Sequence, residues 1–236
     1  MNYQKIVILF VGYLFGLIQT GYFYAKIMHV DLRSKGSGNT GTTNTLRVMG
    51  KKAGAIVFLG DFLKAFIPCM VMKYVIAKHL PDGEFDAMIY TFYIGLGVIL
   101  GHNFPFFLKF KGGKGIACTG AVAIALDGWL SLFGYGAFAL LVFLTGYVSF
   151  ASLYSVSQTF ILIIIHNYVW SYGLTSHGKV ELVVLCVITM MLAFYQHRKN
   201  IARLMNGTEN KFNTRKHKEP KQIVEETQID ETEESD

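Results

Sequence analysis

The chain has 236 residues, of which 52% are hydrophobic, 14% are aromatic and only 16% are charged. This composition is unusual for a soluble domain of that length, and apolar stretches near the ~20 residues that cross a bilayer recur along it. The formal net charge of +6 comes from basic residues between these stretches, without an RNA- or DNA-binding motif. We therefore expect a membrane protein and exclude nucleic acid as a partner.

Seven apolar segments predict an all-α fold, an integral membrane helical bundle with seven transmembrane helices. The predicted spans are residues 4–27, 54–77, 86–103, 116–133, 135–151, 154–172 and 180–197. The first span lacks the small-residue cleavage pattern of a secretory signal, so we count it with the membrane domain, residues 1–212. Residues 213–236 are basic and then strongly acidic, and they predict a disordered charged tail.

Basic residues are distributed unequally between the two sets of loops. The loops over residues 28–53 and 104–115, together with the segment after the last span, carry several Lys and Arg residues each. The loops near 78–85 and 173–179 instead balance lysine against acidic residues. The positive-inside rule therefore predicts a multi-pass cell-membrane protein with an external N-terminus, and with its C-terminus and polar motifs in the cytoplasm.

A few polar and sulfur-containing residues lie inside or beside the apolar segments. Cys69, Cys118 and Cys186 form no C-x-x-C pair, so they predict small apolar residues and neither a disulfide framework nor a zinc site. Asp61 and Lys64 are three positions apart in the second span, a spacing that allows a structural salt bridge. We expect no metal and no other cofactor.

The first polar loop contains "DLRSKGSGNTGTTNTLR", residues 31–47, with a G-x-G-x-x-G at Gly36, Gly38 and Gly41. A dinucleotide fingerprint needs this pattern between a strand and a helix, and a membrane span with a polar run precedes it here. Glycines let backbone N–H groups turn toward an anion, and hydroxyls, amides and Arg47 add donors, so a phosphate site is physically sensible. A solvated, turn-rich loop is the simpler interpretation of this stretch taken alone.

The second polar stretch, "GHNFPFFLKFKGGKGIACTG", places Lys114 among Gly112, Gly113 and Gly115. It is not a P-loop, because Gly115 stands where Walker A requires Ser or Thr. A lysine on a glycine hinge at the start of a helix still meets a phosphate as a point charge. Ordinary flanking charge is the alternative, and His102 is equally open as a helix-end hydrogen-bonding residue or a ligand group.

The third stretch is "HRKNIARLMNGTENKF", residues 197–212. On a helix, His197, Asn200 and Arg203 share one face, and Gly207 is a natural stop. This predicts a polar face that continues from a membrane span. An interfacial basic helix that anchors the chain is the alternative.

Taken together and in this order, the three stretches resemble the bacterial acyl-phosphate:glycerol-3-phosphate acyltransferase family, the PlsY type. The resemblance rests on "SGNTGTTNTLRVMGKKAG", "GHNFPFFLKFKGGKG" and "HRKNIARLMNGTENK", and it spans residues 1–212. It implies a seven-helix membrane enzyme that moves a fatty acyl group from acyl phosphate to the sn-1 hydroxyl of glycerol 3-phosphate. The products would be 1-acylglycerol 3-phosphate (lysophosphatidate) and phosphate, in phospholipid biosynthesis. Membrane lipid and an acyl-phosphate-forming acyltransferase would be functional partners.

The resemblance also implies roles for individual residues. The catalytic residues would be Ser37, Arg47, Lys114, His197 and Asn200. The residues that bind substrate phosphate would be Gly38, Asn39, Gly112, Gly113, Gly115 and Ser149. The serine comes from the short turn "YVSFAS", in which Ser152 is a second candidate for the same position.

The implied chemistry agrees with these residue types. Acyl phosphate is a mixed anhydride with a stabilised leaving anion, so the enzyme must position substrates, neutralise two phosphates and remove one hydroxyl proton. The base is either His197 or the phosphate of glycerol 3-phosphate, and we favour the phosphate because no carboxylate in the motifs is obviously ready to orient His197. The H-x-x-x-x-D dyad of other glycerophosphate acyltransferases and the G-x-S-x-G elbow do not occur.

Two other classes of protein share some of these features. An organic-phosphate transporter would use broken helices and basic residues, but it should bind near the bilayer midplane and often shows inverted repeats. Here the polar stretches gather on one predicted face of the membrane. A non-catalytic scaffold gives no reason for the glycine-rich loop before the fourth span, so an enzyme is the favoured interpretation.

Overall fold

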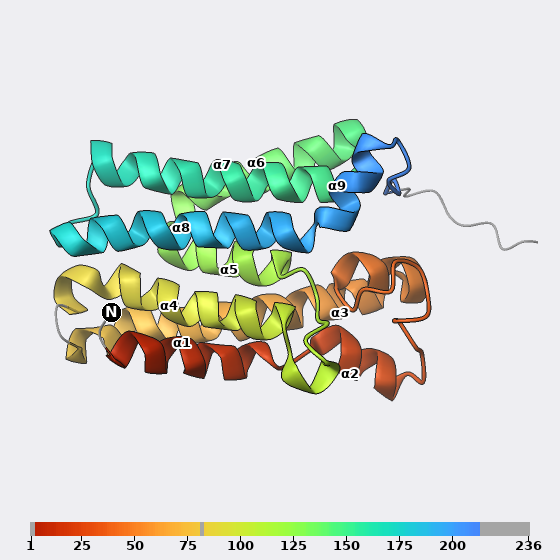
Figure 1. The fold of residues 1–236 in the computed structure, drawn as a ribbon, viewed down its shortest axis with the longest axis horizontal. Helices are drawn as coiled ribbons and strands as arrows, with labels where there is room; N and C mark the ends of the chain where they lie inside the picture. The colour runs from red at the N-terminus through yellow and green to blue at the C-terminus, as the bar shows by residue number, and fades with distance from the viewer. Residues whose placement is uncertain (1–2, 81–82, 213–236) are drawn as a thin grey trace, which may run out of the picture.

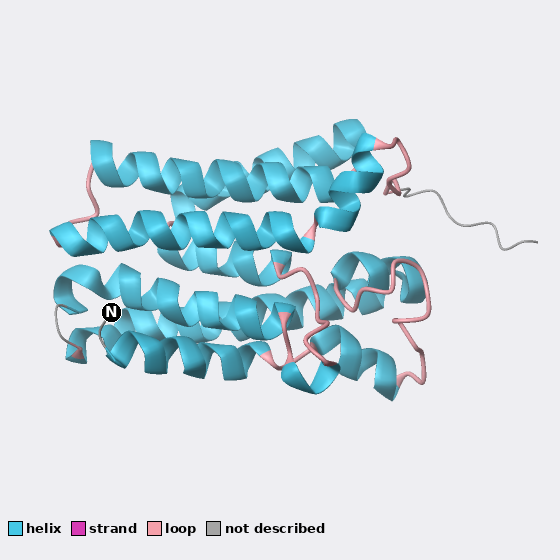
Figure 2. Cartoon of the chain, in the orientation of Figure 1, coloured by secondary structure: helices cyan, strands magenta, loops and turns pink. Residues whose placement is uncertain are grey.

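The computed structural model describes residues 3–80 and 83–212, and the secondary structure in these ranges is helical (Figure 1). The helices are α1 (Tyr3–Gly16), α2 (Thr20–Ile27), α3 (Thr42–Val71), η1 (Met72–Ile76), η2 (Ala77–His79), α4 (Gly83–Asn103), η3 (Phe106–Leu108), α5 (Ile116–Leu126), α6 (Gly128–Thr145), α7 (Val148–Val169), α8 (Ser176–Gln196) and α9 (Arg198–Met205). Figure 2 shows them joined by loops, the longest of which, residues 28–41, connects α2 to α3. The all-α fold is confirmed, whereas the predicted tail, residues 213–236, lies outside the described residues.

The longer helices lie side by side along the long axis of the molecule, with large apolar side chains on their outer surface (Figure 1). Within the described ranges, six helical segments are long and apolar enough to cross a membrane, and α5 is a shorter apolar helix of 11 residues. On α6, Trp129 is 77% exposed and Phe143 is 85% exposed. Such a surface is matched to lipid rather than to water. The chain is a multi-pass membrane protein, and the count of seven spans stays a prediction.

The predicted boundaries of the spans over 116–133 and 135–151 are wrong. Asp127 begins a new helix there, because its Oδ1 accepts a hydrogen bond of 2.9 Å from the amide of Leu130 and caps α6. Gly146 then ends α6 in the left-handed conformation, with φ of 75°. The sequence pattern missed these breaks because lipid-facing and protein-facing sides of these helices are both apolar, which leaves little periodicity to read.

Helices α1 and α4 pack closely because glycines face each other across the contact. Gly12 and Gly16 lie one turn apart on α1, and Gly97 and Gly101 do so on α4. A Cβ added to Gly101 would lie 2.1 Å from the carbonyl oxygen of Tyr13. Small residues at such positions let membrane helices approach backbone to backbone. This contact brings the end of α4 next to the break between α1 and α2.

The predicted salt bridge is present, and the three cysteines are buried as expected. Lys64 Nζ lies 2.8 Å from Asp61 Oδ1, and both side chains are 3% exposed. The three cysteines, Cys69, Cys118 and Cys186, are buried and free. A charged pair in the membrane domain is tolerated because each charge compensates the other.

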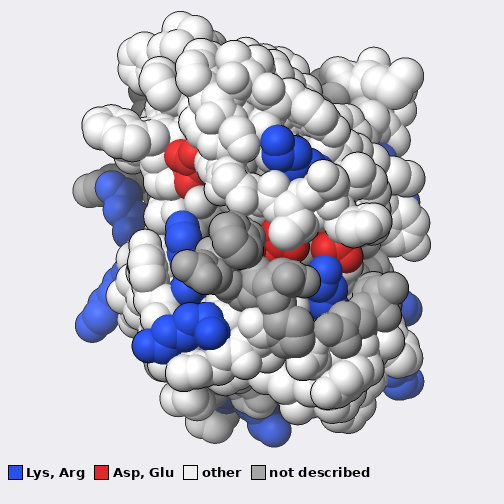
Figure 3. All heavy atoms as spheres, turned by 90° about the vertical axis from the view of Figure 1, so that its left-hand side faces the viewer, with Lys and Arg blue, Asp and Glu red and all other residues white. Residues whose placement is uncertain are grey.

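The two ends of the bundle differ in their charged residues. The α1 start and the α7–α8 connection lie at the end that faces the viewer in Figure 3, where acidic and basic side chains both appear. At this end Lys5 of α1 forms an ion pair with Glu181 of α8. The three polar stretches singled out in the sequence lie at the opposite end (Figure 1).

Candidate active site

One cavity of about 460 Å³ collects residues from all three polar stretches. It lies at the end of the bundle formed by the start of α3, the start of α5 and α9 (Figure 1). The predicted site residues that line it are Ser37, Asn39, Arg47, Lys114, Gly115, Ser149, His197 and Asn200. Gly38, Gly112 and Gly113 are outside its lining. The fold therefore assembles most of the predicted set around one space.

The first loop is folded around Asn44, a residue that the sequence reasoning missed. Its side chain is almost completely buried, and Oδ1 accepts a hydrogen bond of 2.8 Å from the amide of Ser37. Its Nδ2 donates to the carbonyl oxygens of Leu32 and Lys35 at 3.3 and 3.1 Å. Because Asn44 takes the Ser37 amide, the hydroxyl is the group that Ser37 offers to the cavity. A buried amide within a loop of small polar residues was the signal that could have found Asn44.

Arg47 reaches the cavity because α3 is broken one turn later. Gly50 has φ of 86°, a left-handed value that interrupts the helix. The first turns of α3 then fold against the remainder, and a Cβ on Gly54 would lie 2.8 Å from Cβ of Leu46. Among the residues that the structure describes, the guanidinium of Arg47 makes no hydrogen bond or ion pair. It is therefore available to an anion.

The end of α4 holds the second loop in place. The amide of Gly112 donates to the carbonyl oxygen of Asn103, and the amide of Gly113 donates to that of His102, each at 3.1 Å. These two amides satisfy the last carbonyls of α4, which would otherwise lack donors. The geometry thus uses both glycines to anchor the loop, and Lys114 is the group of this loop that extends to the cavity.

Lys114 belongs to a chain of hydrogen bonds that links three elements. Its Nζ donates to Asn200 Oδ1 at 2.6 Å, and Asn200 Nδ2 donates to Glu209 Oε1 at 2.6 Å. Glu209 Oε2 accepts from Arg203 Nε at 2.6 Å, and Oε1 also accepts from the Ser149 hydroxyl at 2.9 Å. Charge-assisted bonds of this kind are strong and directional. They orient the Asn200 amide with its oxygen toward the lysine.

Glu209 is the second residue that the sequence reasoning missed. The chain turns back after α9 at Gly207, which has φ of 69°, and the amide of Phe212 donates to the carbonyl oxygen of Gly146 at 2.6 Å. This docking brings the Glu209 side chain, 6% exposed, to the start of α7. A single acidic residue in the otherwise basic third stretch was the available signal. Its carboxylate orients Asn200 rather than His197.

The two serine candidates have different partners, and neither lies in a turn. The predicted turn is instead the beginning of α7, and both Ser149 and Ser152 line the cavity. The Ser152 hydroxyl donates to the carbonyl oxygen of Val148 in its own helix at 2.8 Å. Ser149 is the one of the two that joins the Glu209 network.

Burial changes the proton affinities of the charged groups in this network. Burial lowers the pKa of Lys114 to about 8, with Arg203 and Arg47 adding to the decrease and Glu209 opposing it. For Glu209, burial raises the pKa, but hydrogen bonds from Asn200, Arg203 and Ser149 outweigh it and the net pKa is lowered. At neutral pH the site therefore holds a carboxylate and a lysine that is charged but close to its titration range.

His197 is a neutral imidazole in this environment. Its Nδ1 lies 2.8 Å from the carbonyl oxygen of Ala193, so Nδ1 donates and Nε2 carries the free lone pair. Burial, together with the nearby Lys114 charge, lowers the pKa of His197 to about 4. The ring lines the cavity as a hydrogen-bond acceptor of low basicity.

The remainder of the cavity lies among α5, α6 and α7, and its lining is mainly apolar. Its lining there includes Ala123 of α5, Phe138 and Val142 of α6, and Val156 and Phe160 of α7. One end thus presents cations and hydrogen-bonding groups, and the other presents aliphatic and aromatic side chains. Such a shape suits an amphipathic ligand with an anionic head and an apolar tail.

Comparisons with known proteins point to one family. A family model described as glycerol-3-phosphate acyltransferase matches residues 6–207. The glycerol-3-phosphate acyltransferase of Clostridioides difficile (strain 630) is 37% identical over 215 residues, which cover 91% of this chain and 98% of that protein. A crystal structure of PlsY, an integral membrane glycerol 3-phosphate acyltransferase in its glycerol 3-phosphate form, matches with a TM-score of 0.76 at 33% identity. The match covers 89% of this chain and 96% of PlsY.

A second PlsY structure, described as the lysophosphatidic acid form, matches with a TM-score of 0.73 at 32% identity over the same shares of both chains. The resemblance inferred from the three polar stretches is thus confirmed by sequence and by fold. The match to the family model and the match to the PlsY structure each extend over nearly the whole described part of the chain, and not over the three polar stretches alone. The chain with this cation-lined membrane cavity belongs to the glycerol-3-phosphate acyltransferase family.

Proposed function

We propose that this protein transfers a fatty acyl group from acyl phosphate to the sn-1 hydroxyl of glycerol 3-phosphate, and releases lysophosphatidate and inorganic phosphate. The acceptor agrees with the ligands named for the two PlsY structures. The donor is the finer part of the proposal. A reactive mixed anhydride must be produced by another enzyme, so we include functional coupling to an acyltransferase that forms acyl phosphate.

The observation that carries the proposal is the cavity that joins a cationic end to an apolar remainder. Two phosphate groups must be held close together, and Arg47 and Lys114 supply two cations for them. The hydroxyls of Ser37 and Ser149 add neutral donors. The acyl chain would occupy the apolar part among α5, α6 and α7. The acyl donor would enter this part from the membrane, and the lysophosphatidate product would return to it.

In the proposed reaction, the sn-1 oxygen of glycerol 3-phosphate forms a bond to the acyl carbonyl carbon. The bond between that carbon and the phosphate oxygen then breaks, and inorganic phosphate leaves with the electron pair. The hydroxyl proton must move to a base. The low pKa of His197, about 4, makes it a weak acceptor at neutral pH. We therefore assign the proton to the phosphate of glycerol 3-phosphate, whose second pKa is about 6, and assign orientation of the hydroxyl to His197 Nε2.

The pH dependence of kcat/KM is expected to report Lys114. The lysine carries its charge below its pKa of about 8 and loses it as the pH rises above that value. The phosphate would then lose a cation, so kcat/KM should fall on the alkaline side of about pH 8. Initial rates measured from about pH 6 to about pH 10 would test this. Lys114→Arg keeps the charge, so its profile should lack this alkaline limb even if its rate is lower.

A transporter of organic phosphates is the second candidate, and the position of the polar groups disfavours it. A transporter holds its substrate near the midplane between two gates. In this chain the cations that line the cavity lie at one end of the bundle, and the lining nearer the middle is mainly apolar with a few uncharged hydroxyls. This arrangement suits a reaction at the membrane surface.

The decisive experiment is reconstitution of the purified protein in lipid vesicles with palmitoyl phosphate and glycerol 3-phosphate. We expect inorganic phosphate and lysophosphatidate to appear in equal amounts. Absence of product from acyl phosphate would refute the proposed donor. Product from acyl-CoA alone would assign the protein to a different reaction.

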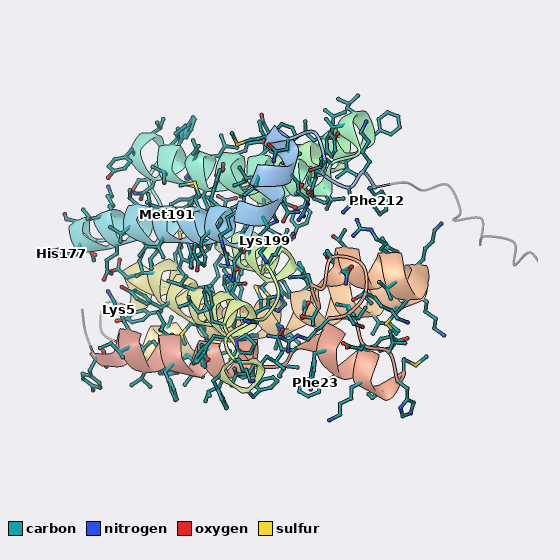
Figure 4. All side chains as sticks on the ribbon, turned by 45° about the vertical axis from the view of Figure 1, so that its right-hand side comes forward. Lys5, Phe23, His177, Met191, Lys199 and Phe212 are labelled. Carbon is teal, nitrogen blue, oxygen red and sulfur yellow. The ribbon has the colours of Figure 1, made fainter. Side chains whose placement is uncertain are left out.

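We also propose that the cavity end faces the cytoplasm, because the basic loops gather there. His177 lies near the start of α8 and Lys199 lies on α9, which follows the end of α8, and both side chains are exposed (Figure 4). His177→Cys should react with a membrane-impermeant maleimide in intact cells, whereas Lys199→Cys should react only after lysis. The native cysteines are buried, so they add little background. The reverse labelling pattern would invert the proposed orientation.

A further inference from the structure

A buried polar cluster lies next to the loop that carries Lys114 and has no part in the proposed reaction. It consists of Asp61 and Lys64 of α3 and His102 at the end of α4, with side chains 3%, 3% and 5% exposed. An Asp–Lys pair would already satisfy both charges. Charge compensation alone therefore does not explain why His102 belongs to the cluster or why the cluster lies beside the cavity.

Lys64 uses all three of its hydrogens within this cluster. Its Nζ donates to Asp61 Oδ1 at 2.8 Å, to the carbonyl oxygen of Ile18 at 2.6 Å and to His102 Nδ1 at 2.8 Å. An ammonium group has no acceptor, so Nδ1 of His102 must accept and the proton of the neutral ring lies on Nε2. Lys64 therefore determines both the tautomer and the orientation of the imidazole.

The imidazole in turn supports the glycine loop. A Cβ added to Gly113 would lie only 2.0 Å from His102 Nε2 and 2.7 Å from Cε1, so the ring edge rests against the backbone of Gly113. The amide of Gly113 also donates to the carbonyl oxygen of His102 at 3.1 Å. Both the main chain and the side chain of His102 thus locate the residue immediately before Lys114.

We propose that Lys64, held by Asp61, is a positioning residue that acts through His102 and Gly113 to place Lys114 for the reaction. Lys114 Nζ keeps a hydrogen bond of 2.6 Å to Asn200 only while its loop stays where the ring supports it. A displacement of about 1 Å in a catalytic group costs on the order of a hundredfold in rate. The inference rests on the proposed function, in which Lys114 binds a substrate phosphate.

The test is Lys64→Met, which keeps most of the length of the unbranched side chain and removes its three donors. We expect kcat/KM of the folded enzyme to fall by about a hundredfold. We also expect the alkaline limb, set near pH 8 by Lys114, to move upward, because a loop without its support exposes the lysine to water and burial is the main cause of its low pKa. The charged groups that act on Lys114 from the packed elements are Glu209, Arg203 and Arg47.

Lys73→Met is the matched control. Lys73 lies in η1, directly after α3, and its Nζ donates to the carbonyl oxygens of Ala125 and Leu126 at 2.6 and 3.3 Å. Neither it nor those carbonyls line the cavity. This variant should lower the thermal midpoint, because α5 loses donors at its end, and it should leave kcat/KM within about twofold and the alkaline limb unmoved. A purely structural Lys64 would give the same result as Lys73.

His102→Asn is the second variant, because it leaves the Lys64–Asp61 pair in place and removes the ring from Gly113. It should reproduce the lower kcat/KM and the upward shift of the alkaline limb, and it decides the question if Lys64→Met does not fold. Folded variants with wild-type kcat/KM and an unmoved limb would overturn the proposal. If neither variant folds, the cluster serves folding and the assigned kinetic role fails. Failure of the proposed function is separate, since the wild-type protein would then make no product from acyl phosphate.

Discussion

Replacing Lys114 by alanine is expected to lower kcat/KM for acyl transfer about a thousandfold. Removal of one donor that stabilises developing charge in an enclosed site lowers the rate by roughly 10²–10³-fold, and this substitution also removes a full charge. Lys114 Nζ donates a hydrogen bond of 2.6 Å to Asn200 Oδ1, so the substitution also removes one of the two partners that orient the Asn200 amide, the other being Glu209. Initial rates of phosphate release from palmitoyl phosphate, measured with purified enzyme in vesicles, give the result.

Lys199→Ala is the matched control for this prediction. Lys199 lies on α9, is exposed and does not line the cavity (Figure 4). Lys199→Ala removes the same formal charge as Lys114→Ala, so a general effect of the protein's net charge would appear in both variants. We expect its kcat/KM to stay within about twofold of the wild type. A Lys114→Ala enzyme that loses less than about tenfold would show that Lys114 does not hold a substrate phosphate in the transition state.

Gly113→Ala is expected to lower kcat/KM by at least about a hundredfold, although it adds only one methyl group. The new Cβ would lie 2.0 Å from His102 Nε2, a distance that no relaxed contact allows. His102 cannot move aside easily because Lys64 holds Nδ1 at 2.8 Å. The loop must shift instead, and Lys114 shifts with it. The measurement is again kcat/KM, together with a thermal unfolding curve that reports the folded fraction.

Gly136→Ala provides the comparison for the added methyl group. Gly136 lies in α6, and a Cβ built there meets nothing within 4 Å. Alanine favours helix over glycine by about 1 kcal/mol, so this variant should be at least as stable as the wild type and equally active. If Gly113→Ala were as active as Gly136→Ala, the close packing between the loop and His102 would have no role in catalysis.

The sequence predicted the composition of the site better than its internal contacts. Eight of the site residues that the resemblance implied line the cavity, among them Arg47, Lys114 and Asn200. The resemblance implies that the glycines bind phosphate, whereas the amides of Gly112 and Gly113 donate to the carbonyl oxygens at the end of α4. A glycine in a loop indicates a close approach of the backbone, and the sequence alone does not say what approaches it.

Two contacts that the sequence did not predict, those of Glu209 with Ser149 and of His102 with Lys64, have a common reason. Glu209 reaches Ser149, 60 positions earlier in the chain, only because the segment after α9 folds back onto the start of α7. His102 is joined to Lys64, 38 positions earlier, across the contact between α3 and α4. Helical spacing predicts neighbours three or four positions apart, as it did for Asp61 and Lys64. It does not predict contacts between residues that are far apart in the chain.

By itself, the sequence determined that the chain is an all-α membrane protein and which polar stretches carry its chemistry. Those conclusions depend on local properties, namely the apolar length of each segment and the donors within each loop. Only the tertiary structure decided where α5 and α6 divide, which serine joins the network, and that Glu209 and the Lys64 cluster flank Lys114. Each of these features depends on which faces of the helices meet. The sequence does not mark those faces, because the lipid and the protein interior favour the same apolar side chains.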